Sequence, residues 1–435
     1  MPTKKIYTNT IAQIGSKVLT ALISIVMIKI ITNYLDVAGY GLYTKIYNYL
    51  SIFAVIADLG LYTITVRELT KYEDDREMIK KISGNVLSLR TLSGGIIIFL
   101  SLAIAPFLSG YDTPSAYIGI ALASLFVLAG LVNSSLMSYL QATLRTEFTL
   151  VANTSGKLLT FGLVFLFAGV LYPAVDGSMD EVKFGLVMLA GLAGNILMMC
   201  LTWWYTGRFI KITFHWDKKY IREIIKLSLP YGIALFLNVI FFKVDTILLS
   251  VLETREIADT AVALYGLPMK LVEVGMMYGT IFLNSLLPVL TSAHEKGDTA
   301  KFRKISRHAL MLLSFGGLIG ACILYFGAEA IIKIISTEAF VSTKLLGYSS
   351  VDALKIVAWI FLVYFISSLY TYILISKGEQ RKMMYINAFV ALTNIAGNII
   401  FIPRYSFIGS AWVTLVTQVL LLIITFLAAH KKKSI

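Results

Sequence analysis

Charged side chains inside otherwise apolar stretches are the residues of this sequence best suited to chemistry. The acids that clearly lie in such stretches are Asp58, Asp245 and Glu273. A lysine or arginine at the bilayer centre costs roughly 2.5 to 3.5 kcal/mol even on the lenient insertion scale. We therefore expect these side chains to face a wet cavity or an oppositely charged partner. The basic residues in these stretches are Lys17, Lys29, Lys45, Arg90, Lys157, Lys243, Lys270 and Lys355.

Position along each stretch separates the basic residues. Lys29, Lys45 and Lys355 lie near the predicted ends, where a long stem can reach the headgroups, so snorkelling stays open beside exposure to a cavity. The other basic residues lie further from the ends, with Lys157 and Lys243 the deepest. We expect a cationic lumen that binds an anionic substrate, formed by Lys17, Arg90, Lys157, Lys243, Lys29 and Lys45.

Two short spacings constrain where the charges of the second half point. Lys270 and Glu273 stand three residues apart on one helical face, so we expect them to neutralise each other. Lys243 and Asp245 are two residues apart and project from roughly opposite sides of a helix. Lys243 and Asp245 therefore cannot both point into one narrow cavity.

The two aspartates are candidates for ion coupling or for helix pairing. Asp245 shares a helical face with Asn238 and Tyr231, which indicates a face turned inward or toward another helix. Asp58 directly precedes Leu59-Gly60 deep in an apolar stretch, where it would pair with a basic side chain or take up a proton. Glu273 is a third candidate for either role.

The interior as a whole carries more positive than negative charge. Lysine and arginine bind phosphate well where water is partly excluded, so this interior favours an anionic cargo. The sequence contains no phosphate-binding Walker loop, no zinc-binding helix and no nucleophile elbow. We expect no metal, no cofactor and no enzymatic activity, because the histidines lie in separate loops at His215, His294, His308 and His430 and the cysteines Cys200 and Cys322 lie in separate apolar stretches.

The elements that position these charges are predicted to be transmembrane helices. The 435 residues are 57% hydrophobic and 14% charged, with a mean hydropathy of +0.79, whereas about 25% charged residues is usual in a soluble domain. A crossing needs roughly 20 mostly apolar residues. We predict an all-helical polytopic protein with helices at 11–32, 42–66, 84–108, 115–141, 148–172, 184–207, 224–251, 261–290, 309–335, 351–376, 385–403 and 407–429. Only a tight turn at 403–406 separates the last two.

The distribution of basic residues predicts the orientation of these helices. Most lysine and arginine residues outside the spans fall in alternate loops, at 67–81, 208–226, 296–307 and 377–382, and at both termini. This asymmetry places the basic loops and the N- and C-termini in the cytoplasm. The formal net charge of +13 is then explained by topology and anionic headgroups, without nucleic acid.

A sparse internal repeat divides the chain. Leu42-Tyr43 begins a span that leads to Lys80-Lys81-Ile82-Ser83, and Leu264-Tyr265 begins one that leads to Arg303-Lys304-Ile305-Ser306. An even number of predicted helices separates the copies, so both would have the same orientation. The repeat predicts an N-terminal six-helix lobe at 1–210 and a C-terminal six-helix lobe at 211–435, with a cavity between them.

Several short motifs occur in order along the chain. They are Gly39-Tyr40-Gly41-Leu42-Tyr43, Ala57-Asp58-Leu59-Gly60-Leu61, Arg67-Glu68-Leu69, Leu229-Pro230-Tyr231-Gly232, Leu248-Leu249 after Asp245, Ala263-Leu264-Tyr265, and Pro288 before a charged loop. Together they resemble the polysaccharide transport family, the O-antigen and capsule repeat-unit flippases of the multidrug/oligosaccharidyl-lipid/polysaccharide exporter superfamily. The resemblance covers nearly the whole chain, but each motif is made of common residues, so the resemblance rests on their order, their spacing and the helix count.

The resemblance implies a flippase in the bacterial cytoplasmic membrane. It would move a polyprenyl-pyrophosphate-linked oligosaccharide for O-antigen lipopolysaccharide, capsule or exopolysaccharide synthesis, by alternating access and without making or breaking a bond. The implied partners are the lipid-linked anionic oligosaccharide, membrane lipids, a polysaccharide polymerase with its chain-length regulator, and Na⁺ or H⁺. A cation-coupled multidrug antiporter and a lipid II flippase of the same superfamily stay open as alternatives. A membrane glycosyltransferase would need a large outer loop or an acidic metal motif, and neither is present.

Overall fold

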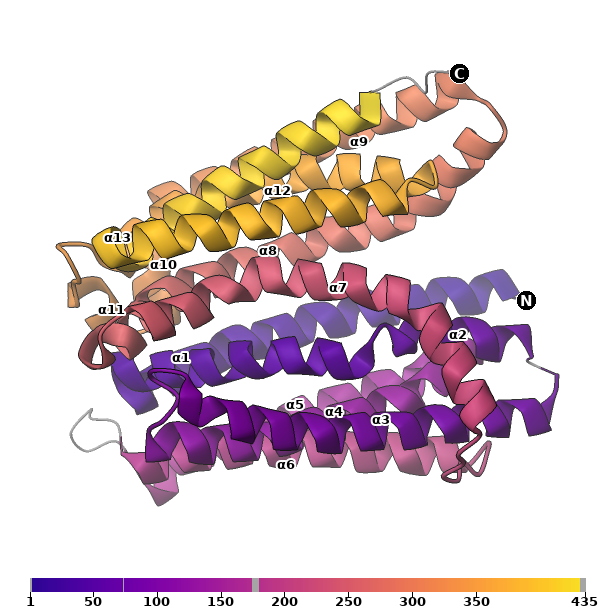
Figure 1. Cartoon of the computed structure of the whole chain (residues 1–435), viewed down its shortest axis with the longest axis horizontal. Coiled ribbons are helices and arrows are strands. Elements are labelled where there is room, and N and C mark those ends of the chain that lie inside the picture. Colours follow the sequence, from indigo (N-terminus) through magenta and orange to yellow (C-terminus); the bar gives the residue numbers. More distant parts are fainter. Residues whose placement is uncertain (1, 73, 174–179, 431–435) are drawn as a thin grey trace. The chain divides into compact units, whose positions relative to one another are not determined.

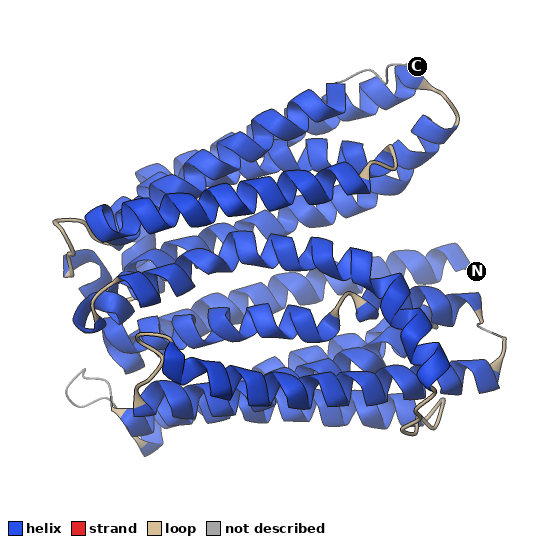
Figure 2. Ribbon diagram, in the orientation of Figure 1, coloured by secondary structure: helices blue, strands red, loops and turns tan. Residues whose placement is uncertain are grey.

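The computed structural model describes residues 2–72, 74–173 and 180–430, without the side chains of residues 2–19 and 21. The described residues form helices and no named strand, as the secondary-structure colouring of Figure 2 shows. Ten of the helical segments are long and apolar enough to cross a membrane. The predicted fold class, an all-helical polytopic membrane protein, is confirmed.

Two of these ten segments, the first and the last, each contain a reversal of the chain. Helix α1 (Pro2–Asp58) has a non-helical residue at Asp36, and α13 (Gln380–His430) has one at Ser406. Figure 1 shows both helices doubling back on themselves at these points. Each therefore supplies two crossings, which brings the total to about twelve. Both reversals fall where the sequence predicted a break between two spans.

Local contacts explain why the chain can turn so tightly at these residues. At Asp36, where φ is 60°, the carboxylate accepts a hydrogen bond of 2.7 Å from the backbone N–H of Gly39 and so caps the next helical run. After Ser406 the two halves of α13 lie so close that a Cβ on Gly409 would stand 2.8 Å from the Phe401 carbonyl oxygen. Glycine at 409 therefore permits the close return of the chain.

The chain separates into two compact units, Met1–Val239 and Ile240–Ile435. The helices of the first unit after α1 are α2 (Leu61–Lys71), α3 (Arg76–Ile104), α4 (Pro114–Ala142), α5 (Thr146–Leu166) and α6 (Glu181–Gly207). Within the unit, α3 packs on α4, and α6 packs on both α4 and α5. Glycines bring α5 and α6 together, since a Cβ on Gly156 would stand 2.6 Å from the Gly194 carbonyl oxygen.

The boundary between the units lies inside α7 (Lys218–Leu252). The segment that leads into α7 is bound to the first unit, because the Asp217 N–H donates to the Asn85 side-chain oxygen of α3 at 2.6 Å. Ile224 then packs in a buried cluster with Leu61 and Val86. These contacts explain why the first half of α7 belongs to the first unit, although the sequence repeat predicts a lobe that ends at residue 210.

The second unit is built around α12 (Ser350–Ser376). Helix α12 packs against α8 (Arg255–Glu295), α9 (Thr299–Phe326) and α13. Its Phe361 and Phe365 rings fill the space left by glycines of α8. A Cβ on Gly275 would stand 2.1 Å from the Phe361 ring, and a Cβ on Gly279 would stand 2.6 Å from the Phe365 ring. The sequence-predicted helix at 309–335 is wrong as a single element, since Gly327 separates α9 from the short α10 (Ala328–Ile335). The four-residue α11 (Ala339–Ser342) follows.

Corresponding helices of the two units share details that support the internal repeat. Helices α3 and α9 both begin after an aspartate, Asp75 or Asp298, whose carboxylate caps the backbone N–H three residues on, at 3.0 and 2.9 Å. A serine follows each capping aspartate by eight residues, Ser83 after Asp75 and Ser306 after Asp298. The hydroxyl oxygens of both serines are buried without a hydrogen-bond partner among the described residues. The internal repeat remains a prediction, and these shared local details agree with it.

Candidate functional site

A buried ion pair lies at the end of α1 in the first unit. Asp58 and Arg90 of α3 are in direct hydrogen-bond contact, with Arg90 fully buried and Asp58 partly exposed. A second guanidinium nitrogen lies 3.4 Å from the Ser135 hydroxyl of α4. The Nε atom of Arg90 is buried and has no partner among the described residues. Pairing with Asp58 neutralises the Arg90 charge, one of the six that the sequence assigned to a cationic lumen.

Asp58 owes its position to a break between α1 and α2. Leu59 and Gly60 have φ angles of 45° and 72°, which end one helical run and begin the next. Residues of α7 fill this break, because a Cβ on Gly232 would stand 2.6 Å from the Leu59 carbonyl oxygen and a Cβ on Gly60 would stand 2.7 Å from the Tyr231 ring. Two motifs far apart in the sequence, Asp58-Leu59-Gly60 and Tyr231-Gly232, are therefore in contact.

Two lysines share one carboxylate in the second unit. Glu273 of α8 contacts Lys243 of α7 at 2.5 Å and Lys270 of its own helix at 3.8 Å. The sequence predicted the Lys270 contact, and the structure adds a shorter one to Lys243. The side chains of Lys243 and Glu273 are 21% and 22% exposed, and that of Lys270 is 51% exposed. The cluster keeps a formal charge of +1 and stays accessible from outside the unit's core.

Asp245 is the centre of a fully buried polar network in the second unit. Its Oδ2 atom accepts hydrogen bonds of 2.6 Å from the hydroxyls of Tyr265 on α8 and Thr414 on α13. Its Oδ1 atom accepts one of 2.8 Å from the Asn398 side-chain amide, also on α13. The Ser410 hydroxyl in turn donates to the Asn398 oxygen at 2.7 Å. The reversal at Ser406 allows this network to form, because it brings Asn398, which precedes the reversal, and Thr414, which follows it, to the same carboxylate.

The partners of Asp245 suit a carboxylate that exchanges a small cation. All of the side chains that donate to it are neutral hydroxyls or amides, and no ion pair of the described residues includes it. A buried charge without an oppositely charged partner is costly, so such a carboxylate takes a proton or binds a cation. The hydroxyl oxygens of Tyr265 and Thr414 contact it, and oxygen is the donor that hard cations prefer.

The sequence identified Asp245 and missed the residues around it. Tyr265, Asn398 and Thr414 lie far from it along the chain, so no local spacing indicates the contact. A signal was present within α13, where Asn394 and Asn398 stand four residues apart and Ser410 and Thr414 repeat that interval in a later run of apolar residues. Two polar stripes at helical spacing inside a span indicate inward faces.

The other basic residues assigned to a cationic lumen lie in different surroundings. Lys45 is buried, and its ammonium donates to the Gly110 carbonyl at 2.6 Å above the Tyr111 ring, so it contacts the turn that precedes α4. Lys29 is half-buried on α1 and Lys157 is exposed on α5. Lys17 lies on α1, outside the residues whose side chains are described. Substrate binding by Lys17, Lys29, Lys45, Lys157, Arg90 and Lys243 remains a prediction.

Histidine, cysteine and acidic side chains form no cluster of three or more that would hold a metal within the described part of the chain. Lys355 is exposed near the start of α12. The predicted site residues thus fall into three separate charged groupings of different kinds. They are a neutral buried pair at Asp58, a positive cluster at Glu273 and a buried acid at Asp245.

The sequence and the fold both match known membrane transporters. The family model for polysaccharide biosynthesis proteins matches residues 6–294, and a second model, MatE, matches residues 230–400. No curated protein sequence matches the chain.

Solved structures share the fold at low sequence identity. An inward-facing multidrug resistance MATE transporter of the MOP superfamily is 13% identical, with a TM-score of 0.78, 96% of this chain covered and 97% of that one. The lipid II flippase MurJ, in an inward closed conformation, is 17% identical, with a TM-score of 0.72 and coverages of 98% and 88%. A MOP superfamily transporter from Pyrococcus furiosus is 14% identical, with a TM-score of 0.67 and coverages of 98% and 94%.

These matches and the helical architecture define a multi-pass membrane transporter of the MOP superfamily. The polysaccharide biosynthesis model covers well over half of the 435 residues. The chain therefore belongs to that family, the polysaccharide transport branch of the superfamily.

Proposed function

We propose that the protein is a flippase that moves a polyprenyl-pyrophosphate-linked oligosaccharide repeat unit across the bacterial cytoplasmic membrane, by alternating access. The observation that carries this proposal is the match of residues 6–294 to the polysaccharide biosynthesis family, in a chain with about twelve predicted crossings. The likeness in fold to a lipid II flippase supports it, because that protein also takes a lipid-linked substrate. The product would serve O-antigen, capsule or exopolysaccharide synthesis.

The Lys243–Glu273–Lys270 cluster is our proposed contact for the anionic headgroup. One carboxylate cannot neutralise two ammonium groups, so a positive charge remains for a pyrophosphate or an acidic sugar. A flexible lysine binds phosphate as a point charge and loses little when the ligand departs. Both properties suit a site that must release its cargo. The neutral Asp58–Arg90 pair is less suited to this role.

Asp245 is our proposed coupling residue. Transport against a gradient requires a second solute whose binding differs between the two access states. A buried carboxylate with neutral partners can bind Na⁺ or H⁺ and then stabilise the contacts that join α7, α8 and the two halves of α13. Cation binding at Asp245 would in this way favour one arrangement of these helices.

Complementation tests the proposed cargo. The chain is expressed in bacteria that lack their own O-antigen or capsule flippase, and surface polysaccharide is detected by blotting. We expect polymer to return with the wild type and to fall about thirtyfold with Lys243→Gln/Lys270→Gln, because each of the two lost contacts weakens binding by about 1 kcal/mol. Lys355→Gln, an exposed lysine outside the cluster, is the matched control and should behave like the wild type.

The second candidate function is cation-coupled multidrug export, favoured by the MatE match over residues 230–400. The same strains distinguish the two functions when their growth in cationic drugs is measured. Resistance to drugs without surface polymer, at normal protein levels in the membrane, would replace flipping with efflux. Rescue of a strain that lacks its lipid II flippase, without O-antigen or capsule, would shift the cargo to the peptidoglycan precursor.

A further inference from the structure

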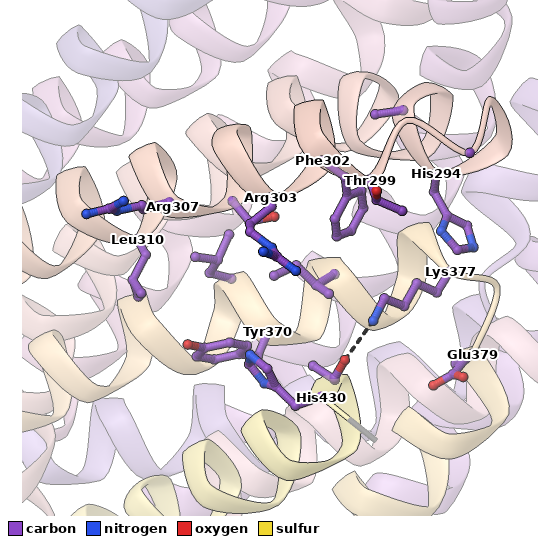
Figure 3. A pocket seen from close by; sticks show the side chains of 16 residues that line it. His294, Thr299, Phe302, Arg303, Arg307, Leu310, Tyr370, Lys377, Glu379 and His430 are labelled. Carbon is purple, nitrogen blue, oxygen red and sulfur yellow. Dashed lines mark hydrogen bonds between the residues drawn. The ribbon is translucent and has the colours of Figure 1, made fainter. Parts of the chain in front are cut away.

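A basic pocket opens at one end of the second unit, away from Asp245 and Glu273. It encloses about 800 Å³ between the last turn of α8, the first turns of α9 and the last turns of α12 and α13. Figure 3 shows Arg303 of α9 reaching toward the residues of α12 and α13. The charged, hydroxyl and imidazole side chains that line it include Arg303, Arg307, Ser306, Lys377, Glu379 and His430.

The charge of the pocket is positive. Arg303, Arg307 and Lys377 line it, and Glu379 is the one acid among its described lining residues. Glu379 is already paired with Lys382, at 3.0 Å, so it does not neutralise the arginines. Arg303 and Arg307 take part in no ion pair among the described residues, and they stand four residues apart on α9. Figure 3 shows the Arg303 side chain turned toward α12 and α13 and the Arg307 side chain pointing along α9. Arginines that line one pocket suit a tetrahedral oxyanion.

Two further groups in the pocket favour a bound anion. Lys377 donates to the Ala429 carbonyl at the end of α13, at 2.6 Å (Figure 3), and burial lowers its pKa. A negative ligand would offset that burial and raise the pKa of Lys377 again. The Ser306 hydroxyl oxygen is buried and lacks a partner among the described residues, so it is free to donate to a ligand.

One side of the pocket is apolar. Phe302, Leu310, Leu369 and Ile373 line it together with the charged groups. Leu310, Leu369 and Ile373 belong to segments that are apolar enough to cross a membrane. The pocket therefore joins a cationic end to an apolar side formed by membrane-spanning helices. A ligand with a phosphate and a hydrocarbon tail fits both halves, whereas a free anion uses only one.

We infer that this pocket binds the phosphate group of a membrane lipid, with Arg303 and Arg307 on the phosphate and the lipid tail along α9. The inference stands without the proposed flippase function, because either an ordinary anionic phospholipid or a polyprenyl diphosphate carries this chemistry. Basic pockets between transmembrane helices at the membrane surface bind such headgroups. Bound lipid would tie the ends of α9, α12 and α13 together.

The test uses the full chain in nanodiscs of phosphatidylcholine, with lipid retention measured by native mass spectrometry. Phosphatidylglycerol, polyprenyl diphosphate and inorganic phosphate are added in separate arms. The variant Arg303→Gln/Arg307→Gln removes both pocket arginines. Its matched control, Lys301→Gln/Lys304→Gln, removes the same charge from the same helix at exposed positions that do not line the pocket.

We expect the arginine variant to retain phosphatidylglycerol or polyprenyl diphosphate about tenfold less well than the wild type, and the lysine control to retain it normally. The arm with the larger loss identifies the lipid. Equal losses in both variants would show general attraction to surface charge and would overturn the inference. Displacement of the lipid by millimolar inorganic phosphate would overturn it too, because the pocket would then be a site for free anions.

Discussion

At the scale of single residues, the molecule treats its intramembrane charges in three different ways. Arg90 is neutralised by Asp58, Lys45 is bound to a backbone carbonyl, and Lys243 shares Glu273 with a second lysine. Burial bears on the difference, since a fully buried cation needs a close partner. Of these three arrangements, the Glu273 cluster is the one that leaves a partly exposed positive charge for a ligand.

Asp245→Asn should separate folding from coupling. The amide keeps the shape of the side chain and can still accept from Tyr265, Thr414 or Asn398, so we expect the protein to reach the membrane. Loss of the negative charge removes the cation or proton site. Flipping in liposomes should therefore lose its dependence on a Na⁺ or pH gradient.

The control for this prediction is Thr425→Val, which removes a hydroxyl that bonds only to carbonyls of its own helix, α13. This variant should keep the wild-type response to both gradients. An Asp245→Asn protein that still responds to a gradient would place the coupling site elsewhere in the chain.

At the scale of elements, glycines set how closely the helices of the second unit approach. A Cβ on Gly320 of α9 would stand 2.3 Å from the Phe361 ring of α12, whereas a Cβ on Gly316 would meet nothing within 4 Å. Gly320→Ala should destabilise the protein by about 1 to 3 kcal/mol, the usual cost of overpacking. Thermal unfolding in detergent measures this cost.

Gly316→Ala is the matched control, on the same helix and one turn earlier. Alanine favours helix over glycine, so this change should leave the midpoint of unfolding unchanged or raise it slightly. Equal midpoints for the two variants would mean that the α9 to α12 contact is looser than described.

The junction between α3 and α7 predicts a pH dependence. The Lys81 ammonium lies 2.7 Å from the Asp217 carboxylate. This ion pair lowers the pKa of Asp217 to about 2, together with hydrogen bonds that the carboxylate accepts from the backbone N–H groups of Tyr220 and Lys219. A carboxylate whose folded pKa is depressed stabilises the fold above its unfolded pKa, about 3.9. That stabilisation is lost as the pH falls from about 4 toward about 2.

Asp217→Asn tests this dependence and keeps an oxygen to cap α7. We expect its unfolding midpoint to lie below that of the wild type near neutral pH, and the difference to shrink as the pH falls below about 4. A constant difference across this range would show that the ionisation of Asp217 does not supply the lost stability.

The sequence predicted the elements better than their contacts. Runs of apolar residues and the break at Pro403 to Ser406 predicted both halves of α13, because hydropathy and turn chemistry are local. The partners of Asp245 could not be predicted, since they lie 20 to 169 residues away. Lys45 was misleading for the same reason. Its position near a predicted span end suggested snorkelling, whereas a carbonyl 65 residues away binds it.

At the scale of the whole molecule, the even number of crossings predicts that both termini lie on one side of the membrane. The basic loops and Lys431-Lys432-Lys433 predict that this side is the cytoplasm. Green fluorescent protein fused to the C-terminus should fluoresce, and alkaline phosphatase at the same position should stay inactive. An active phosphatase there would mean an odd number of crossings or the opposite orientation.

The reversals in α1 and α13 also constrain how the protein is made. The 51 residues of α13 form two helical runs that meet at Ser406, and together they are far longer than the roughly 20 residues of one crossing. Since Ser406 is its single non-helical residue, no hydrophilic loop separates the two crossings during synthesis. The halves must leave the translocon together as a helical hairpin, with Asn398 already beside Ser410. Biogenesis itself would therefore assemble part of the polar network around Asp245 before the chain is released.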